Sequence, residues 1–277
     1  MLACSSGAVT APSRRPNVAF LPIALVGYVG CILLATLATV YQSAGLRRAA
    51  SVAFGATWVV HLAAVIQEGS LRGGIPLTSG AGYLLVLGWI VLTLHLFVWF
   101  RLQLDVTGLV LPPLAASATL LAWALLSGGA ERPPVESKGW LLFHVTVSTL
   151  GMAILCVAFA MAVLYLLQDR GLKAKRRLSW MQRLPALEKC DRLGLQALVV
   201  GFLLLTIGIA TGIVVNADLH ERLWVPGIKQ LLPVLAWLVF ASVLTARTLL
   251  GFRGRKSAYL TIAGFALGLM SVLGMNL

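Results

Sequence analysis

The sequence predicts an all-α integral membrane protein, a bundle of about eight transmembrane helices with both termini outside. Three observations support this fold class. Hydrophobic residues make up 59% of the chain and charged residues 11%, whereas a soluble domain carries about 25% charged residues. Apolar runs of ~20 residues, each long enough to cross the hydrocarbon core as a helix, recur along the sequence. The basic residues gather in alternate loops, as the positive-inside rule describes.

The eight apolar runs are predicted to be helices, because lipid offers no hydrogen-bond partner to a free backbone N–H group. They span approximately 18–41, 48–68, 82–101, 106–127, 140–168, 193–216, 229–250 and 257–276. The second and fourth runs are interrupted, at Gly55 and at Pro112 and Pro113. Residues 1–17, which are small, polar and proline-bearing, are predicted to form a flexible tail. Residues 18–277 are predicted to form a single membrane domain.

The net charge of +13 is distributed unevenly among the loops. Of the 22 Lys and Arg residues, eight lie between Arg170 and Arg192, and acidic residues dilute the basic ones in the opposite loops. This asymmetry places the 170–192 loop in the cytoplasm. The predicted location is the plasma (inner) membrane of a bacterium, which the chain crosses several times. A basic loop beside a membrane attracts anionic lipid headgroups. The predicted partner is therefore the lipid bilayer and not nucleic acid.

The sequence offers no motif of an enzyme. Its cysteines are Cys4, Cys31, Cys156 and Cys190, and they show neither CxxC nor zinc-site spacing. No loop shows a catalytic motif that pairs a nucleophile with a base, or two carboxylates with each other. We therefore expect no catalytic residues, and any activity has to come from the helices and their short loops.

Histidines are the residues that need an explanation, because ionisable side chains inside a membrane usually face a partner or a ligand. The predicted outer level of the bundle holds His61, His144, His220, Trp140 and Trp224. His95 is predicted toward the cytoplasmic end of the third span. A lone histidine in a span often only hydrogen-bonds to a neighbouring helix, which is the simpler interpretation for His95 and His220.

His61 and His144 allow a second interpretation. They belong to different predicted spans, the second and the fifth, and both need a partner in apolar surroundings. Neutral imidazole is a good ligand for iron. Two imidazoles from separate helices could hold a haem between them at the outer leaflet, and the spacing by itself leaves both interpretations open.

A stripe of small residues marks the sixth span, in the stretch "GFLLLTIGIATGIVV" at 201–215. Gly201, Gly208 and Gly212 are separated by seven and by four residues, which places them near one face of a helix. Such a face lets another helix, or a flat ligand, approach the backbone closely. The stripe therefore predicts a packing seam, and it does not by itself identify a ligand.

Four segments carry a resemblance to a known family: "WLLFHV" at 140–145, "LYLLQDRGLK" at 164–173, "RLPALEKCDRLGLQALVVGFLLLTIGIATG" at 183–212 and "AWLVFASVLTARTLLGFRGRKSAYLTIAGF" at 236–265. In this order they resemble the cytochrome c assembly membrane-protein family, which includes CcsA, HemX and YpjD. The resemblance extends over about residues 55–277. It implies an eight-helix bundle, binding of non-covalent b-type haem, and a role in handling haem for c-type cytochrome assembly.

On this resemblance, His144 and His61 are the expected haem-iron ligands, with Gly208 and Gly212 packing the macrocycle. The expected secondary contributors are His220, Trp224 and Trp140. The chain also departs from CcsA, whose outer loop ends in W-x-W-D-P-K-E, because residues 216–233 read "NADLHERLWVPGIKQLLP". It is therefore expected to be closest to the short YpjD- and HemX-type members.

Two other functions stay open at this point. A HemX-like regulator or scaffold of haem biosynthesis would act through the basic 170–192 loop without holding haem. A small-solute transporter is the third possibility, although no charged pair occupies the midplane and no inverted repeat is evident. The candidate protein partners are accordingly a cytochrome c assembly protein or a haem-biosynthesis enzyme.

Overall fold

The computed structural model describes residues 19–127, 139–173, 185–220 and 227–274. The regular elements of this part are all helices, which confirms the predicted fold class of an all-α membrane protein. The α-helices are α1 (Phe20–Tyr41), α2 (Ala44–Arg72), α3 (Gly80–Leu102), α4 (Leu111–Ser127), α5 (Gly139–Lys173), α6 (Leu187–His220), α7 (Ile228–Leu249) and α8 (Arg255–Gly274). Two short 3-10 helices, η1 (Pro76–Thr78) and η2 (Asp105–Leu109), precede α3 and α4. Within the described residues, eight helical segments are long and apolar enough to cross a membrane.

The two interrupted runs form helices for identifiable reasons. Pro112 and Pro113 are the second and third residues of α4, and proline is tolerated in the first turn because its missing N–H group has no partner there. η2 supplies the start of the fourth span. Gly55 lies inside α2 without ending it, and α2 begins at Ala44, four residues earlier than predicted, because the Ser43 side chain accepts from the backbone N–H of Leu46 at 3.4 Å.

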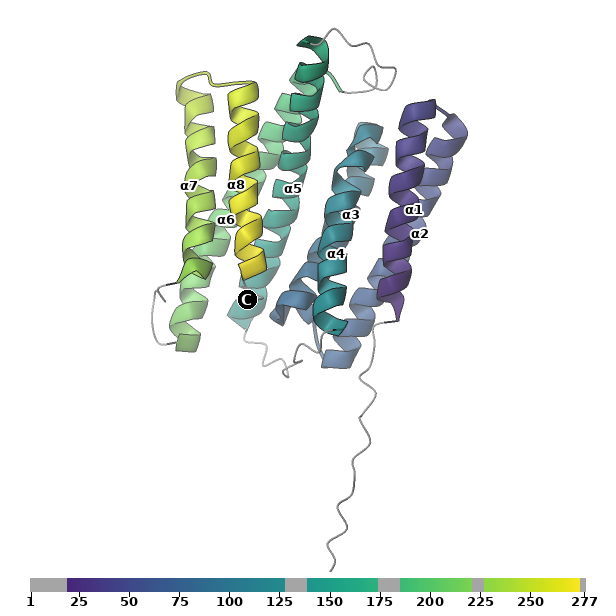
Figure 1. Ribbon diagram of the computed structural model, residues 1–277. Helices are drawn as coiled ribbons and strands as arrows, with labels where there is room; N and C mark the ends of the chain where they lie inside the picture. The colour runs from purple at the N-terminus through teal and green to yellow at the C-terminus, as the bar shows by residue number, and fades with distance from the viewer. Residues whose placement is uncertain (1–18, 128–138, 174–184, 221–226, 275–277) are drawn as a thin grey trace, which may run out of the picture.

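The helices run alternately up and down (Figure 1). The described start of α1 and the described end of α8 lie on the same face of the bundle, at the bottom of the view. The connections α1–α2, α3–α4 and α7–α8 lie on the opposite face. The assignment of the first face to the outer side remains a prediction from the loop charges, and the predicted tail 1–17 lies outside the described residues.

The face that we predict to be cytoplasmic is held together by ion pairs between helices. Arg247 of α7 donates to both carboxylate oxygens of Asp191 on α6, at 2.9 and 2.6 Å, and also to the Ser257 hydroxyl of α8 at 3.0 Å. Arg255 of α8 pairs with Asp169 near the end of α5. These contacts connect all four C-terminal helices at one level.

The bundle has two halves that meet at α3 and α5. Helices α1–α4 form one half of the view in Figure 1 and α5–α8 the other. Inside the second half, α5 and α6 approach closely along the predicted glycine stripe. A Cβ atom built on Gly201 would lie 2.7 Å from Leu155 Cδ2, and one built on Gly208 would lie 2.8 Å from Ser148 Oγ. The stripe is therefore a helix-packing seam, as its spacing indicates.

Candidate functional site

A cavity of about 490 Å³ opens between the two halves of the bundle, within the range of ordinary small-molecule sites. Its walls come from η1 and the start of α3 on one side and from α5, α6, α7 and α8 on the other. The helices that build it are distant in sequence and meet only in the folded bundle. A ligand bound here would be surrounded by five α-helices, and part of its surface would stay exposed to the exterior.

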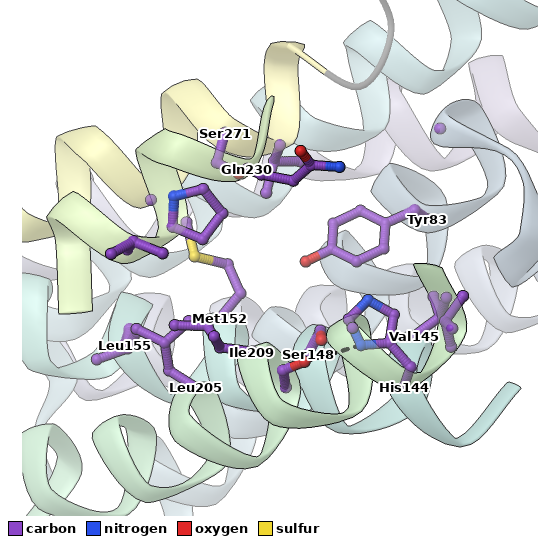
Figure 2. Close-up of a pocket in the computed structure, with 18 of the residues that line it drawn as sticks. Tyr83, His144, Val145, Ser148, Met152, Leu155, Leu205, Ile209, Gln230 and Ser271 are labelled. Carbon is purple, nitrogen blue, oxygen red and sulfur yellow. Dashed lines mark hydrogen bonds between the residues drawn. The ribbon is translucent and has the colours of Figure 1, made fainter. Parts of the chain in front are cut away.

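The cavity is polar at one end and apolar at the other. The polar lining residues near the helix ends on the face that we predict to be outer are Ser79, Tyr83, His144, Asn216, Gln230 and Ser271. The deeper lining residues are Met152, Leu155, Leu205, Phe240 and Phe265. Figure 2 shows Tyr83 and His144 toward one end, with Leu155 and Leu205 at the other. The site therefore suits an amphipathic ligand that lies with its apolar part toward the membrane interior.

His144 is held by one ring nitrogen and presents the other to the cavity. Its Nδ1 lies 2.9 Å from the Gly208 carbonyl oxygen and 3.1 Å from the Thr211 hydroxyl. A carbonyl oxygen only accepts, so Nδ1 carries the proton and donates it. Nε2 is then the nitrogen with the free lone pair, and both hydrogen bonds of the ring to described residues are made by Nδ1. Figure 2 shows Nε2 on the cavity side of the ring.

The position of the His144 ring depends on the α6 backbone. A Cβ atom on Gly212 would lie 3.0 Å from His144 Cε1, so glycine at this position allows the ring to rest against the helix. The Thr211 hydroxyl donates to the Ile207 carbonyl oxygen at 2.8 Å, which leaves its lone pairs to accept from His144 Nδ1. The small residues at 208 and 212 and the threonine at 211 therefore fix both the place and the tautomer of His144.

The structure does not bring His61 to this site. His61 is fully buried among α1, α2 and α3 and does not line the cavity. Its Nε2 donates to the Leu85 carbonyl oxygen at 3.1 Å, and its Nδ1 accepts from the Tyr28 hydroxyl at 2.9 Å. Both nitrogens are therefore engaged, and the residue is a hydrogen-bonding link between three helices.

The remaining predicted residues are placed as follows. Gly208 and Gly212 line the cavity as well as the α5–α6 seam. Trp140 lies one turn before His144, is 58% exposed and packs edge-on against Phe143, away from the lining. His220 is the last residue of α6, and its side chain lies outside the described part of the structure, as does Trp224.

His95 has a structural environment of its own. It is fully buried, with Phe54 and Trp99 packed edge-on against its ring, and does not line the cavity. Its Nδ1 lies 3.3 Å from the Thr107 hydroxyl, which itself donates to the Leu104 carbonyl oxygen. The contact links α3 to η2, while Nε2 is buried and has no hydrogen-bond partner among the described residues.

Sequence reasoning missed Tyr83, Gln230 and Ser271, which come to the cavity from α3, α7 and α8. None of them is ionisable at neutral pH or unusual near the end of a membrane helix, so residue type gave no signal. All three lie near helix ends on the face predicted to be outer, and this shared level could have been noticed in the sequence. Their convergence on one cavity follows only from how α3, α7 and α8 pack around α5.

Comparisons with known proteins match the part of the chain that forms the cavity. The model of the family described as "Cytochrome C assembly protein" matches residues 77–277, a range that contains every lining residue of the cavity. A protein of Microcystis aeruginosa, "Cytochrome c biogenesis protein CcsA", is 28% identical over 78% of this chain and 81% of its own length. Proteins with the same name from Guillardia theta and Pyropia yezoensis are each 27% identical, over 74% and 84% of this chain and 74% and 85% of their own lengths. The match of the family model to most of the chain shows that the protein belongs to the cytochrome c assembly protein family.

Proposed function

We propose that the protein handles haem for c-type cytochrome assembly, and that the cavity between the two halves of the bundle would hold a non-covalent b-type haem, with His144 as a ligand of its iron. The single observation that carries this proposal is the hydrogen bond from His144 Nδ1 to the Gly208 carbonyl oxygen at 2.9 Å. Metal-ligating histidines commonly donate their other ring N–H to a backbone carbonyl, which fixes the tautomer and raises the basicity of the ligating nitrogen.

The residues of the cavity fit the cofactor. His144 Nε2 has an available lone pair and faces the cavity, and a single protein imidazole is sufficient to hold haem iron in several protein classes. The apolar residues at the deep end suit the macrocycle, and the polar residues at the other end remain near the exterior. Haem would supply the redox-active iron, while the chain would bind and orient it and keep water from its apolar face.

The names of the relatives support the pathway. Each of the three similar proteins is named as a cytochrome c biogenesis protein, and the family model is named for the same process. No catalytic chemistry of the chain's own is needed for this role, because a haem carrier acts by coordination and presentation. The partner that we infer is an assembly protein or an apocytochrome on the side to which the cavity opens, with the protein in the predicted bacterial plasma membrane.

An absorption spectrum of the detergent-purified protein supplied with haem tests the proposal. We expect a Soret band and reduced α and β bands for the parent protein. His144→Ala is expected to lose most of this haem, and added imidazole is expected to restore part of it, because a free ligand can occupy the space left by the side chain. Phe143→Ala is the matched control, since Phe143 is 47% exposed and absent from the lining.

Two results would contradict the proposal. Equal haem content in His144→Ala and the parent would mean that His144 is not a ligand. A parent protein that never binds added haem would favour the alternative role, a HemX-like membrane regulator acting through the basic 170–192 segment, of which residues 174–184 lie outside the described structure.

A further inference from the structure

The outer end of the cavity contains polar groups that His144 does not use. Asn216 comes from the last turns of α6, Gln230 from the first turn of α7 and Ser271 from the last turn of α8. Because these helices alternate in direction, their outer ends lie at one level of the bundle (Figure 1). Three helices thus bring amide and hydroxyl groups to the same end of one cavity.

Gln230 has an unsatisfied hydrogen-bonding group at this place. Its Oε1 is buried and has no hydrogen-bond partner within the described residues. Because Oε1 is buried, the part of the amide that a ligand in the cavity can reach is the NH2 group, which only donates hydrogen bonds. Figure 2 shows the amide facing the same cavity as Tyr83 and His144.

The opposite end of the cavity would reject polar groups. Leu155 and Leu205 close it from α5 and α6, and Phe240 and Phe265 from α7 and α8. Leu155 lies eleven residues beyond His144 on α5, which is about 16 Å of helix rise. A charged group at that depth would be desolvated without a partner, which is costly.

We propose that the outer end of the cavity is a carboxylate subsite, in which Gln230, with Asn216 and Ser271, binds the propionate edge of haem and fixes its orientation. The proposal rests on the haem function proposed above and adds to it which edge of the ligand faces outward. Amide N–H and hydroxyl groups donate to the carboxylate oxygens, and the vinyl-bearing edge then lies toward Leu155 and Leu205. A fatty acid or phospholipid with its acyl chain in the deep end is the competing occupant.

The experiment compares haem with haem dimethyl ester, in which both propionates are blocked, by Soret titration of the detergent-purified protein. We expect the parent to bind the ester about tenfold more weakly than haem, the loss expected for a hydrogen bond to a charged group. Gln230→Leu should weaken the binding of haem by a similar factor and leave the affinity for the ester unchanged. Gln230→Glu should weaken the binding of haem further, because the two carboxylates repel each other, and should still bind the ester.

Gln67→Leu is the matched control, because Gln67 is a glutamine near the outer end of α2 that does not line the cavity. It should bind both ligands as the parent does. Equal affinity of the parent for haem and ester, together with an unaffected Gln230→Leu, would overturn the subsite and leave the haem function intact. Binding of neither ligand, with lipid co-purifying in the cavity, would overturn the haem function and the subsite with it. Comparable thermal unfolding of the variants excludes misfolding as the cause of a weaker titration.

Discussion

His144 and His61 are residues of the same type in similarly apolar surroundings, and their hydrogen bonds separate them. His144 uses Nδ1 alone, toward Gly208 and Thr211, and so keeps a lone pair for a ligand. His61 uses both ring nitrogens, toward Leu85 and Tyr28. An imidazole with both nitrogens engaged has to lose a buried hydrogen bond before it can bind a metal. The contrast favours a binding role for His144 and a structural role for His61.

Thr211→Val tests whether the hydrogen bonds of His144 tune the site. Valine keeps the shape of threonine but removes the hydroxyl that lies 3.1 Å from Nδ1. We expect haem affinity to fall by about tenfold, the lower end of the effect of removing an outer partner of a metal-binding histidine. The reduction potential of the bound haem should also shift, because the ligand becomes less basic.

Thr146→Val provides the comparison for that variant. The Thr146 hydroxyl donates only to the Leu142 carbonyl oxygen in its own helix and is exposed. Redox titration and Soret titration measure the two quantities. A Thr211→Val protein with the affinity and the potential of the parent would mean that the hydroxyl does not act through His144.

His61→Ala is expected to destabilise the N-terminal half without removing the haem ligand. The change removes the acceptor of the Tyr28 hydroxyl and one donor to the Leu85 carbonyl oxygen, and the hydroxyl keeps the longer contact to the Gly88 carbonyl oxygen at 3.5 Å. Each lost hydrogen bond costs about 0.5–1.5 kcal/mol. We expect a lower Tm in detergent and an unchanged haem content per folded molecule. Loss of haem at an unchanged Tm would instead assign His61 to the binding site.

At the scale of elements, the α5–α6 pair carries both a packing seam and the histidine that we propose as a haem ligand. The glycine stripe of α6 lets the two helices approach along Gly201 and Gly208, and the continuation of the same stripe at Gly212 accommodates the His144 ring. Close approach is what brings the Gly208 carbonyl oxygen within reach of Nδ1. The packing seam and the orientation of the proposed ligand, His144, are therefore produced by one helix contact.

Gly201→Leu tests the seam away from the candidate site. A Cβ atom at this position would lie 2.7 Å from Leu155 Cδ2, so a larger side chain forces the helices apart. Overpacking of this kind costs about 1–3 kcal/mol, and we expect a lower Tm. Gly30→Leu is the control, since a Cβ there meets nothing within 4 Å. An unchanged Tm for Gly201→Leu would show that α5 and α6 tolerate a wider separation.

At the scale of the whole molecule, the alternating helices place the candidate site near one face and the ion-paired basic residues near the other. Arg247 and Asp191 mark the second face, and the polar end of the cavity lies toward the first. If the positive-inside rule sets the orientation, the cavity opens away from the cytoplasm. This is the side on which the proposed haem site would meet an assembly partner.

Thiol labelling in intact cells tests this orientation. Gly227→Cys places a thiol at the exposed start of α7, and Ala44→Cys places one at the exposed start of α2 on the other face. With Cys4 replaced by serine, we expect an impermeant maleimide to label Gly227→Cys and to spare Ala44→Cys until the cells are opened. The reverse labelling pattern would mean that the protein is inserted in the opposite orientation, with the cavity open to the cytoplasm.

The sequence by itself determined the class of the protein and its eight spans, because lipid demands long apolar helices and the chain shows each of them as a run. It also singled out His144 and the glycine stripe, since both are unusual in their spans. It could not separate His144 from His61, because hydrogen-bond partners 24 to 67 residues away decide which nitrogen is free. Nor could it find Gln230, whose type is ordinary and whose position matters only where α7 meets α5, α6 and α8. The tertiary structure decided the site, because a cavity is formed by the packing of several helices and belongs to none of them alone.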